Sequence, residues 1–180
     1  MKDPKKIVVI GPESTGKSTL SQMLGLHFNM PYVKEYARTY IDQLKRPYQE
    51  SDLMEIAKGQ LLEEQAALQQ RSPLIFCDTD LYVIKVWSEH RYHRCATEIL
   101  QQIAKRAYDL YLLTAIDMPW QNDPQREHPD PHMRRYFYAQ YHDIVLQSGV
   151  PWTAVSGDPE ERLQRAIAAI NQYLPAWQKD

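Results

Sequence analysis

A segment near the start of the chain matches the phosphate-binding pattern GxxxxGK[ST]. It consists of Gly11, Pro12, Glu13, Ser14, Thr15, Gly16, Lys17 and Ser18, and Thr19 follows it. Glycines let the backbone curl so that amide hydrogens point inward at phosphate oxygens, and the helix dipole adds to the field. We expect Lys17 to bridge the β- and γ-phosphates of ATP and Ser18 to hold Mg²⁺. A chance glycine-rich turn is disfavoured because the motif, the preceding strand and the following helix agree.

Carboxylates follow two other apolar runs, at positions from which they could reach the phosphate loop. Asp78 ends one run, and this arrangement delivers a carboxylate beside the metal. Asp80 could accept the proton of an attacking hydroxyl, or it could simply cap the next helix. Glu35 competes with Asp80 as the base, and the sequence does not choose between them. Arg38 follows Glu35 by one helical turn, so it would reach the same pocket or form a surface ion pair with Glu35.

A proline-rich polar segment, residues 119–135, predicts a lid loop, with a disordered insertion as the alternative. Arginines in such a lid could cover the charge that develops during phosphoryl transfer, or they could be ordinary solvated loop residues. Arg126 is the favoured candidate for contact with phosphate. Trp120 could stack on a flat ring or pack beneath the lid. Gly157 lies in a Ser-Gly-Asp turn that could wrap the adenine or serve only as a turn and helix cap.

Short β-rich runs alternate with longer amphipathic segments along the chain. The predicted strands are 6–10, 31–34, 74–77, 110–114 and 151–155, and the predicted helices are 17–28, 52–70, 96–108, 134–147 and 159–173. Strands joined through helices imply right-handed crossovers and a parallel sheet between helical layers. The predicted class is therefore α/β, a three-layer P-loop NTPase fold of the nucleoside- and nucleotide-kinase type, with a five-stranded parallel sheet and a lid loop.

The composition is that of a single cytoplasmic globular domain. The 180 residues, of which 43% are hydrophobic and 24% charged, fit one domain spanning 1–180. A net charge of -2 gives no reason to expect a nucleic-acid partner. No run approaches the roughly 18 apolar residues of a membrane span, and Cys77 and Cys95 lack metal or disulfide spacing. The sequence predicts no oligomeric state.

Taken together, these motifs resemble the ribosylnicotinamide kinase domain of the NadR-like P-loop proteins. The resemblance spans nearly the whole chain and is carried by residues 12–18, Glu35-Tyr36-Ala37-Arg38, Asp78-Thr79-Asp80, and Pro119-Trp120 with Asp123 and Arg126. It implies transfer of the ATP γ-phosphate to the 5′-hydroxyl of nicotinamide riboside, which gives nicotinamide mononucleotide and belongs to NAD biosynthesis.

The resemblance also implies roles for individual residues. It assigns Asp78, Asp80 and Glu35 to metal, ribose and proton transfer, and Arg126 to the lid. It assigns Trp120 to the nicotinamide ring, because a cationic pyridinium would suit an aromatic pocket rimmed by an acid such as Asp123.

Two departures from the family pattern limit what the resemblance implies. Family members are often fused to an upstream adenylyltransferase, whereas here the first strand begins almost at Met1, so the resemblance supports no claim to a second activity. The lid also differs, with Pro124-Gln125 and the long stretch 126–135. A kinase for another nucleoside, nucleotide or sugar, or a nucleotide-gated regulatory ATPase module, therefore remains an alternative.

Overall fold

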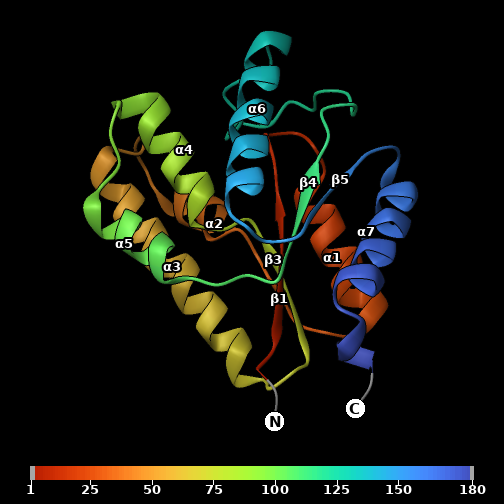
Figure 1. The fold of residues 1–180 in the computed structure, drawn as a ribbon. Helices are drawn as coiled ribbons and strands as arrows, with labels where there is room; N and C mark the ends of the chain where they lie inside the picture. The colour runs from red at the N-terminus through yellow and green to blue at the C-terminus, as the bar shows by residue number, and fades with distance from the viewer. Residues whose placement is uncertain (1–2, 179–180) are drawn as a thin grey trace.

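The computed structural model describes residues 3–178, in which a parallel sheet lies between two layers of helices (Figure 1). The strands are β1 (Lys5–Ile10), β2 (Tyr32–Val33), β3 (Leu74–Asp78), β4 (Leu110–Thr114) and β5 (Trp152–Val155). Their order in the five-stranded sheet is β2-β3-β1-β4-β5, and every neighbouring pair is parallel. The predicted three-layer α/β fold is confirmed.

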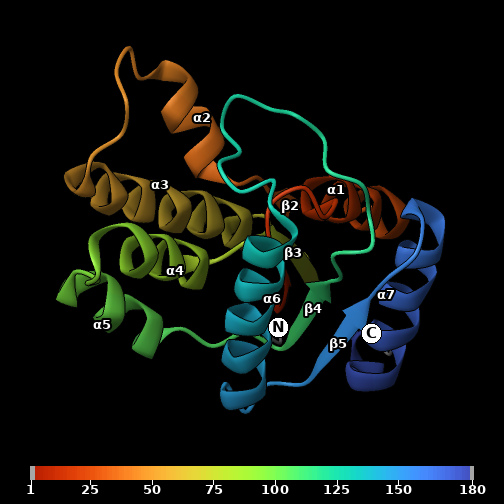
Figure 2. The same cartoon turned by 90° about the horizontal axis from the view of Figure 1, so that it is seen from above.

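The helices divide between the two faces of this sheet (Figures 1 and 2). They are α1 (Lys17–Phe28), α2 (Tyr36–Gln43), α3 (Glu50–Gln69), α4 (Leu81–Tyr92), α5 (Thr97–Lys105), α6 (Pro131–Gln147) and α7 (Pro159–Tyr173), followed by a short 3₁₀ helix, Pro175–Gln178. Helices α1 and α7 cover one face, and α3, α4 and α6 cover the other. Helices α2 and α5 pack against α3 and α4 in a separate apolar cluster.

The central position of β1 in the sheet explains why its sequence is a continuous apolar run and not an alternating one. Ile7 and Val9 point into the cluster under α1 and α7, whereas Val8 and Ile10 point into the cluster under α4 and α6. All four side chains are fully buried. A parallel sheet covered on both faces requires this pattern, and it places the carboxyl ends of all the strands at one edge.

Helices α2 and α4 were not predicted. Helix α2 is short, and α4 is rich in β-branched and aromatic residues such as Val83 and Trp87, which have low helix propensity. Tertiary packing overrides that preference, because α4 buries its apolar face in two clusters at once.

Several boundaries also differ from the predicted ones. Helix α6 begins at Pro131 instead of residue 134, because the Asp130 side chain caps it by accepting from the N–H groups of His132 and Met133. The lid therefore ends at Asp130, five residues earlier than predicted. Strand β2 spans only two residues of the predicted four, and α3 begins two residues before the predicted start.

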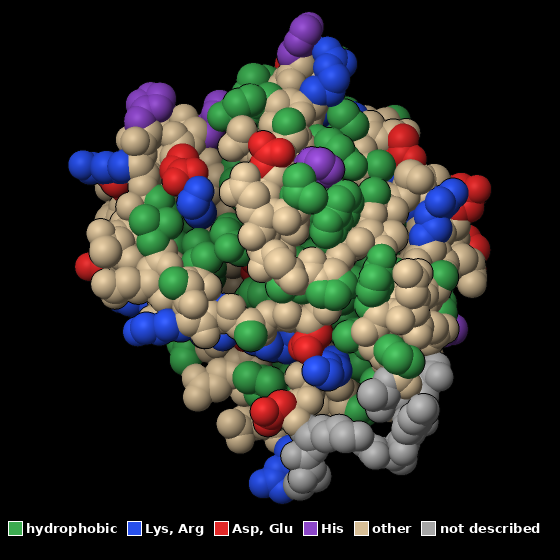
Figure 3. All heavy atoms as spheres, in the orientation of Figure 1, with side chains coloured by type: hydrophobic (Ala, Val, Ile, Leu, Met, Phe, Trp, Pro, Cys, Tyr) green, Lys and Arg blue, Asp and Glu red, His purple; other side chains and the backbone are tan. Residues whose placement is uncertain are grey.

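The face of the molecule seen in Figure 3 carries charges of both signs, and its acidic and basic side chains are interspersed. Within residues 3–178, no helix is long and apolar enough to cross a bilayer.

Candidate active site

The phosphate loop connects β1 to α1 and depends on two glycines. Gly11 has a φ of 149°, and a Cβ atom there would lie 2.3 Å from the Thr114 Oγ1 atom. Gly16 has a φ of 77° at the N-cap of α1. A side chain at either position would meet strain or collision. The loop can therefore curl tightly against the end of β4.

Side chains of the loop hold this curl from within. The Lys17 ammonium donates to the Pro12 carbonyl at 2.8 Å, so it folds back over the loop. The Thr15 hydroxyl lies 2.7 Å from the same carbonyl and 2.7 Å from the Thr114 hydroxyl. These contacts place the lysine charge over the backbone amides, where phosphates would bind.

Asp78, at the end of β3, fits a magnesium site together with Ser18. The carboxylate is buried, and its Oδ1 atom has no hydrogen-bond partner. Burial raises the pKa of Asp78, while the Ser18 hydroxyl and the Lys17 charge lower it. An unpartnered buried carboxylate oxygen beside a hydroxyl suits a hard cation. Among the described residues, no cluster of three or more His, Cys, Asp or Glu side chains is placed for a metal.

Glu35 is the N-cap residue of α2 and lies at the carboxyl edge of the sheet. Its pKa is raised to about 7, first by burial and then by the charge of Asp78, and the cations Lys17 and Arg38 oppose this rise. Such a carboxyl group is a stronger base than an ordinary glutamate.

A cavity of about 250 Å³ opens over the phosphate loop. Its walls include most of the predicted site residues, namely Gly11, Glu13, Ser14, Thr15, Gly16, Lys17, Ser18, Thr19, Glu35, Arg38 and Arg126. The structure thus brings together side chains from three separate stretches of the chain. Val83, Trp87, Met118 and Tyr141 also line the cavity, and the sequence singled out none of these four.

The lid crosses between α2 and α1 above the phosphate loop (Figure 2). The Arg126 guanidinium donates to the Gln121 carbonyl at 2.7 Å and lies 3.4 Å from the Ser14 hydroxyl. Arg134, in the first turn of α6, donates to the backbone carbonyls of Met118 and Ser14 at 3.0 and 3.3 Å. Two arginines therefore border the loop, although only Arg126 lines the cavity.

The far side of the lid is attached to α2. Arg38 forms an ion pair with Asp123 at 2.8 Å, so its partner is the lid and not Glu35. The Gln125 side chain donates to the Arg38 carbonyl at 3.2 Å and to the Asp42 carboxylate. The ion pair is partly exposed and contributes little energy by itself. Together, the ion pair and the Gln125 contacts place the lid beside α2 and Glu35.

Five predicted residues lie outside the walls of this cavity: Asp78 and Asp123, described above, and Asp80, Trp120 and Gly157. The Asp80 carboxylate caps α4 by accepting from the Tyr82 N–H at 2.9 Å, and it also accepts from the Tyr111 hydroxyl at 2.8 Å. Trp120 is half-buried, and its indole N–H donates to the Asn122 side chain at 3.1 Å. The N–H of Gly157 donates to the Asp117 carboxylate at 2.6 Å. The structure thus gives Asp80 and Gly157 the capping and turn positions that the sequence left as alternatives.

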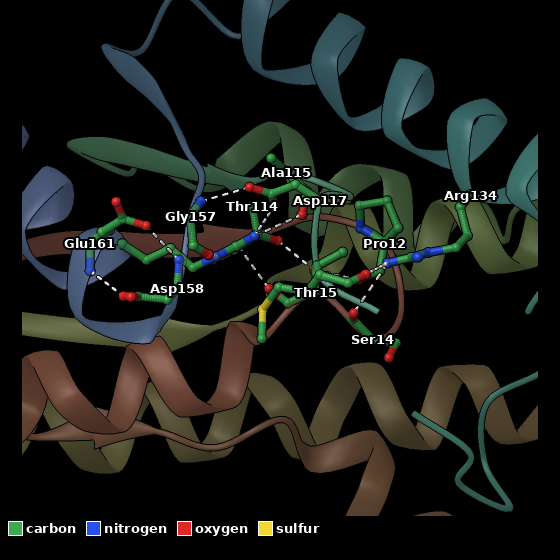
Figure 4. A network of polar contacts seen from close by, with 12 residues as sticks. Pro12, Ser14, Thr15, Thr114, Ala115, Asp117, Arg134, Gly157, Asp158 and Glu161 are labelled. Carbon is green, nitrogen blue, oxygen red and sulfur yellow. Dashed lines mark hydrogen bonds and ion pairs between the residues drawn. The ribbon is translucent and has the colours of Figure 1, made fainter. Parts of the chain in front are cut away.

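Arg162, on α7, was not predicted, because nothing in the local sequence marks it. Its fully buried guanidinium donates to the carbonyls of Gly157 at 2.7 Å, Thr15 at 3.0 Å and Ala115 at 3.2 Å, and it pairs with Asp117. Figure 4 shows how these carbonyls converge from the phosphate loop, the residue after β4 and the turn after β5. One side chain therefore joins three segments around the nucleotide end of the site.

Replacing Arg162 by methionine should destabilise the fold by about 3 kcal/mol, because it leaves buried carbonyl groups without donors. Chemical denaturation would measure the loss. Arg165→Met, at an exposed position on the same helix, is the matched control and should change stability by less than about 0.5 kcal/mol. Equal stabilities for the two variants would show that Arg162 does not hold the three segments together.

A second cavity, of about 240 Å³, adjoins the first and was also missed by the sequence. Glu13, Trp87 and Gln125 line both. The second cavity is aromatic: Tyr48 and Trp87 lie in it with ring centroids 6.3 Å apart and planes at 24°, and Phe137 forms another wall. The two cavities therefore form a cleft with a phosphate-binding end and an aromatic end.

Comparisons with known proteins agree with this architecture. Residues 6–162 match a family model described as an AAA domain. The chain is 24% identical over 177 residues to the trifunctional NAD biosynthesis/regulator protein NadR of Escherichia coli. The aligned segment covers 94% of this chain and 43% of that protein. The chain therefore spans less than half the length of this curated relative.

Solved structures share the fold. A crystal structure of NadR protein in complex with NR matches with a TM-score of 0.78 and 23% identity, over 97% of this chain and 50% of that one. Thymidylate kinase from Ehrlichia chaffeensis matches with a TM-score of 0.67 and 12% identity, over 94% of this chain and 100% of that one. These findings confirm the predicted resemblance to NadR-like P-loop proteins. Because the family model covers most of its length, the chain belongs to this AAA domain family and has the P-loop kinase fold.

Proposed function

We propose that this protein is a kinase that transfers the γ-phosphate of ATP to the 5′-hydroxyl of a nucleoside with an aromatic base, namely nicotinamide riboside. One observation carries the proposal: the cavity that holds Lys17 and Glu35 adjoins an aromatic cavity and shares the wall of Trp87 with it. A phosphate donor and a flat acceptor can thus lie end to end in one cleft.

At the donor end, the loop amides bind the phosphates and Lys17 holds the β- and γ-phosphates together. Ser18 and Asp78 would hold Mg²⁺, which would neutralise charge that develops on the phosphate oxygens. Arg126 lines the cavity from the lid and adds positive charge there. The residues supply positioning and electrostatic stabilisation, which is what phosphoryl transfer requires.

Glu35 is the better candidate for the general base. It lines the cavity beside Lys17, and its raised pKa makes it ready to accept a proton from an attacking hydroxyl. Asp80 has both carboxylate oxygens engaged by neighbours and does not line the cavity. The geometry therefore supports Glu35 over Asp80 as the base that we propose.

The aromatic end supports an acceptor with a flat ring. Trp87 offers a stacking surface at the wall that the two cavities share. The Glu127 carboxylate at the cavity wall pairs with Arg91, whose guanidinium also lies over the Tyr48 ring. NadR has been crystallised with NR and also with NAD and AMP-PNP, which agrees with this acceptor class.

Trp87→Ala should raise the Michaelis constant for nicotinamide riboside by about tenfold, which corresponds to the loss of one aromatic stacking contact of about 1.4 kcal/mol. The constant for ATP should change by less than about twofold. Trp120→Ala is the matched control, because Trp120 lies in the lid outside both cavities. If Trp120→Ala gave the larger acceptor effect, the ring would stack on the lid and not in the aromatic cavity.

A coupled ADP-release assay with Mg²⁺, ATP and a panel of acceptors tests the function directly. Nicotinamide riboside should stimulate ADP release more than adenosine, thymidine or ribose does. Stimulation mainly by another member of the panel would keep the kinase and change its substrate. ATP turnover that no acceptor stimulates would favour a nucleotide-gated regulatory module.

A further inference from the structure

The Glu13 carboxylate holds the lid, although Glu13 belongs to the phosphate loop. Its Oε2 atom accepts from the backbone N–H groups of Glu127 at 3.0 Å and His128 at 3.2 Å. Two successive amides that converge on one charged oxygen form a stronger arrangement than a single neutral hydrogen bond. The contact joins segments more than a hundred positions apart in the sequence.

The two residues fixed in this way form part of the aromatic cavity. Glu127 and His128 line it, and Glu13 lines both this cavity and the cavity over the phosphate loop. The His90 ring packs edge-on against the His128 ring at 5.0 Å, and His128 also packs against Phe137 at 4.8 Å. A shift of the backbone at 127–128 would therefore displace a wall of the cavity.

A glutamate at this loop position has no evident use in binding phosphate. A carboxylate beside a triphosphate repels it, and the loop's backbone amides and Lys17 already provide the attraction. Lid amides that donate hydrogen bonds to the carboxylate weaken this repulsion, and they do so only when the lid is in place. Closure of the lid and occupation of the phosphate loop should therefore favour each other.

We infer that Glu13 is a positioning residue that couples the phosphate loop to the acceptor cavity by holding the lid backbone at Glu127 and His128. The kinetic part of this inference rests on the proposed kinase function. The contact between Glu13 and the lid amides does not depend on that function, so a separate measurement tests it.

Glu13→Ala should raise the Michaelis constant for nicotinamide riboside by about tenfold or more, because one charge-assisted contact is lost. The constant for ATP should rise by less than about threefold. Glu13→Gln keeps an oxygen that can accept from both amides, so it should return the acceptor constant to within about threefold of wild type. Glu63→Ala, at an exposed position on α3, is the control and should leave both constants unchanged.

Hydrogen exchange monitored by mass spectrometry on the unliganded protein tests the contact without any substrate. Exchange in a lid peptide that contains residues 127 and 128 should be about tenfold faster in Glu13→Ala than in wild type, and close to wild type in Glu13→Gln. A peptide from α3 should not change. If wild type phosphorylates no acceptor while this exchange pattern holds, the proposed function fails and the lid contact stands. Unchanged lid exchange, or equal rises in both Michaelis constants, would overturn the inference.

Discussion

Replacing Lys17 by alanine should lower the turnover of ATP by about 10³-fold or more. The reason is geometric, because the ammonium group lies over the curl of the loop, 2.8 Å from the Pro12 carbonyl, and no other lysine or arginine of the loop can replace it. Its charge is needed most as negative charge moves between the β- and γ-phosphates.

The measurement is single-turnover ADP formation with saturating Mg²⁺ and acceptor. Lys58→Ala is the control, since Lys58 is exposed on α3 and pairs with Glu55 at 2.7 Å. Lys17→Arg should be impaired as well, because a planar guanidinium does not reproduce a compact ammonium charge. Near-normal turnover by a folded Lys17→Ala protein would exclude the loop as the reaction site.

Glu35→Gln should lower kcat by about 10²- to 10⁴-fold, the range that a general base supplies. The substitution keeps the size of the side chain and removes its ability to take a proton. The Michaelis constant for ATP should change little, because the loop amides and Lys17 bind the phosphates. Steady-state kinetics with varied acceptor and varied ATP would separate the two effects.

Asp80→Asn is the informative comparison for Glu35→Gln. Asp80 is buried and accepts from the Tyr82 N–H and the Tyr111 hydroxyl. Its replacement should therefore act mainly on stability, which a lower melting temperature would show. We expect a loss in kcat of less than about tenfold. A large loss of kcat in Asp80→Asn, with little change in Glu35→Gln, would assign the base to Asp80 instead.

The fold followed from the sequence because its signals are local and strong. The apolar run 7–10, a phosphate loop and a helical segment follow one another within about twenty residues, and each predicts the next. The helix α4 was missed because its first turns, rich in valine, isoleucine and tyrosine, carry strand-like preferences that only packing against β3 and α3 overrides.

The candidate site could be predicted only in part, for a related reason. Lys17, Glu35 and Arg38 follow strand ends, and a parallel sheet brings all such ends to one edge. Arg162 and Trp87 lie on helices whose sequence shows no motif, so only the folded chain places them beside the loop. A motif identifies chemistry near itself, whereas the acceptor cavity is assembled from distant segments.

The position of Asp80 shows how one pattern can have two physical meanings. An aspartate two residues after a strand end suits catalysis and helix capping equally well in the sequence. Its carboxylate is taken up by Tyr111, a residue of β4 that lies far away along the chain. Sequence spacing could not reveal that partner.

Phosphorus NMR of a mixture of the protein, Mg²⁺, ATP and nicotinamide riboside tests the central claim most directly. The account predicts that the γ-phosphate signal of ATP falls while a phosphate monoester signal rises in equal amount, and that neither change occurs without the riboside. A γ-phosphate signal that stays constant, or that is converted only to inorganic phosphate, would contradict the account.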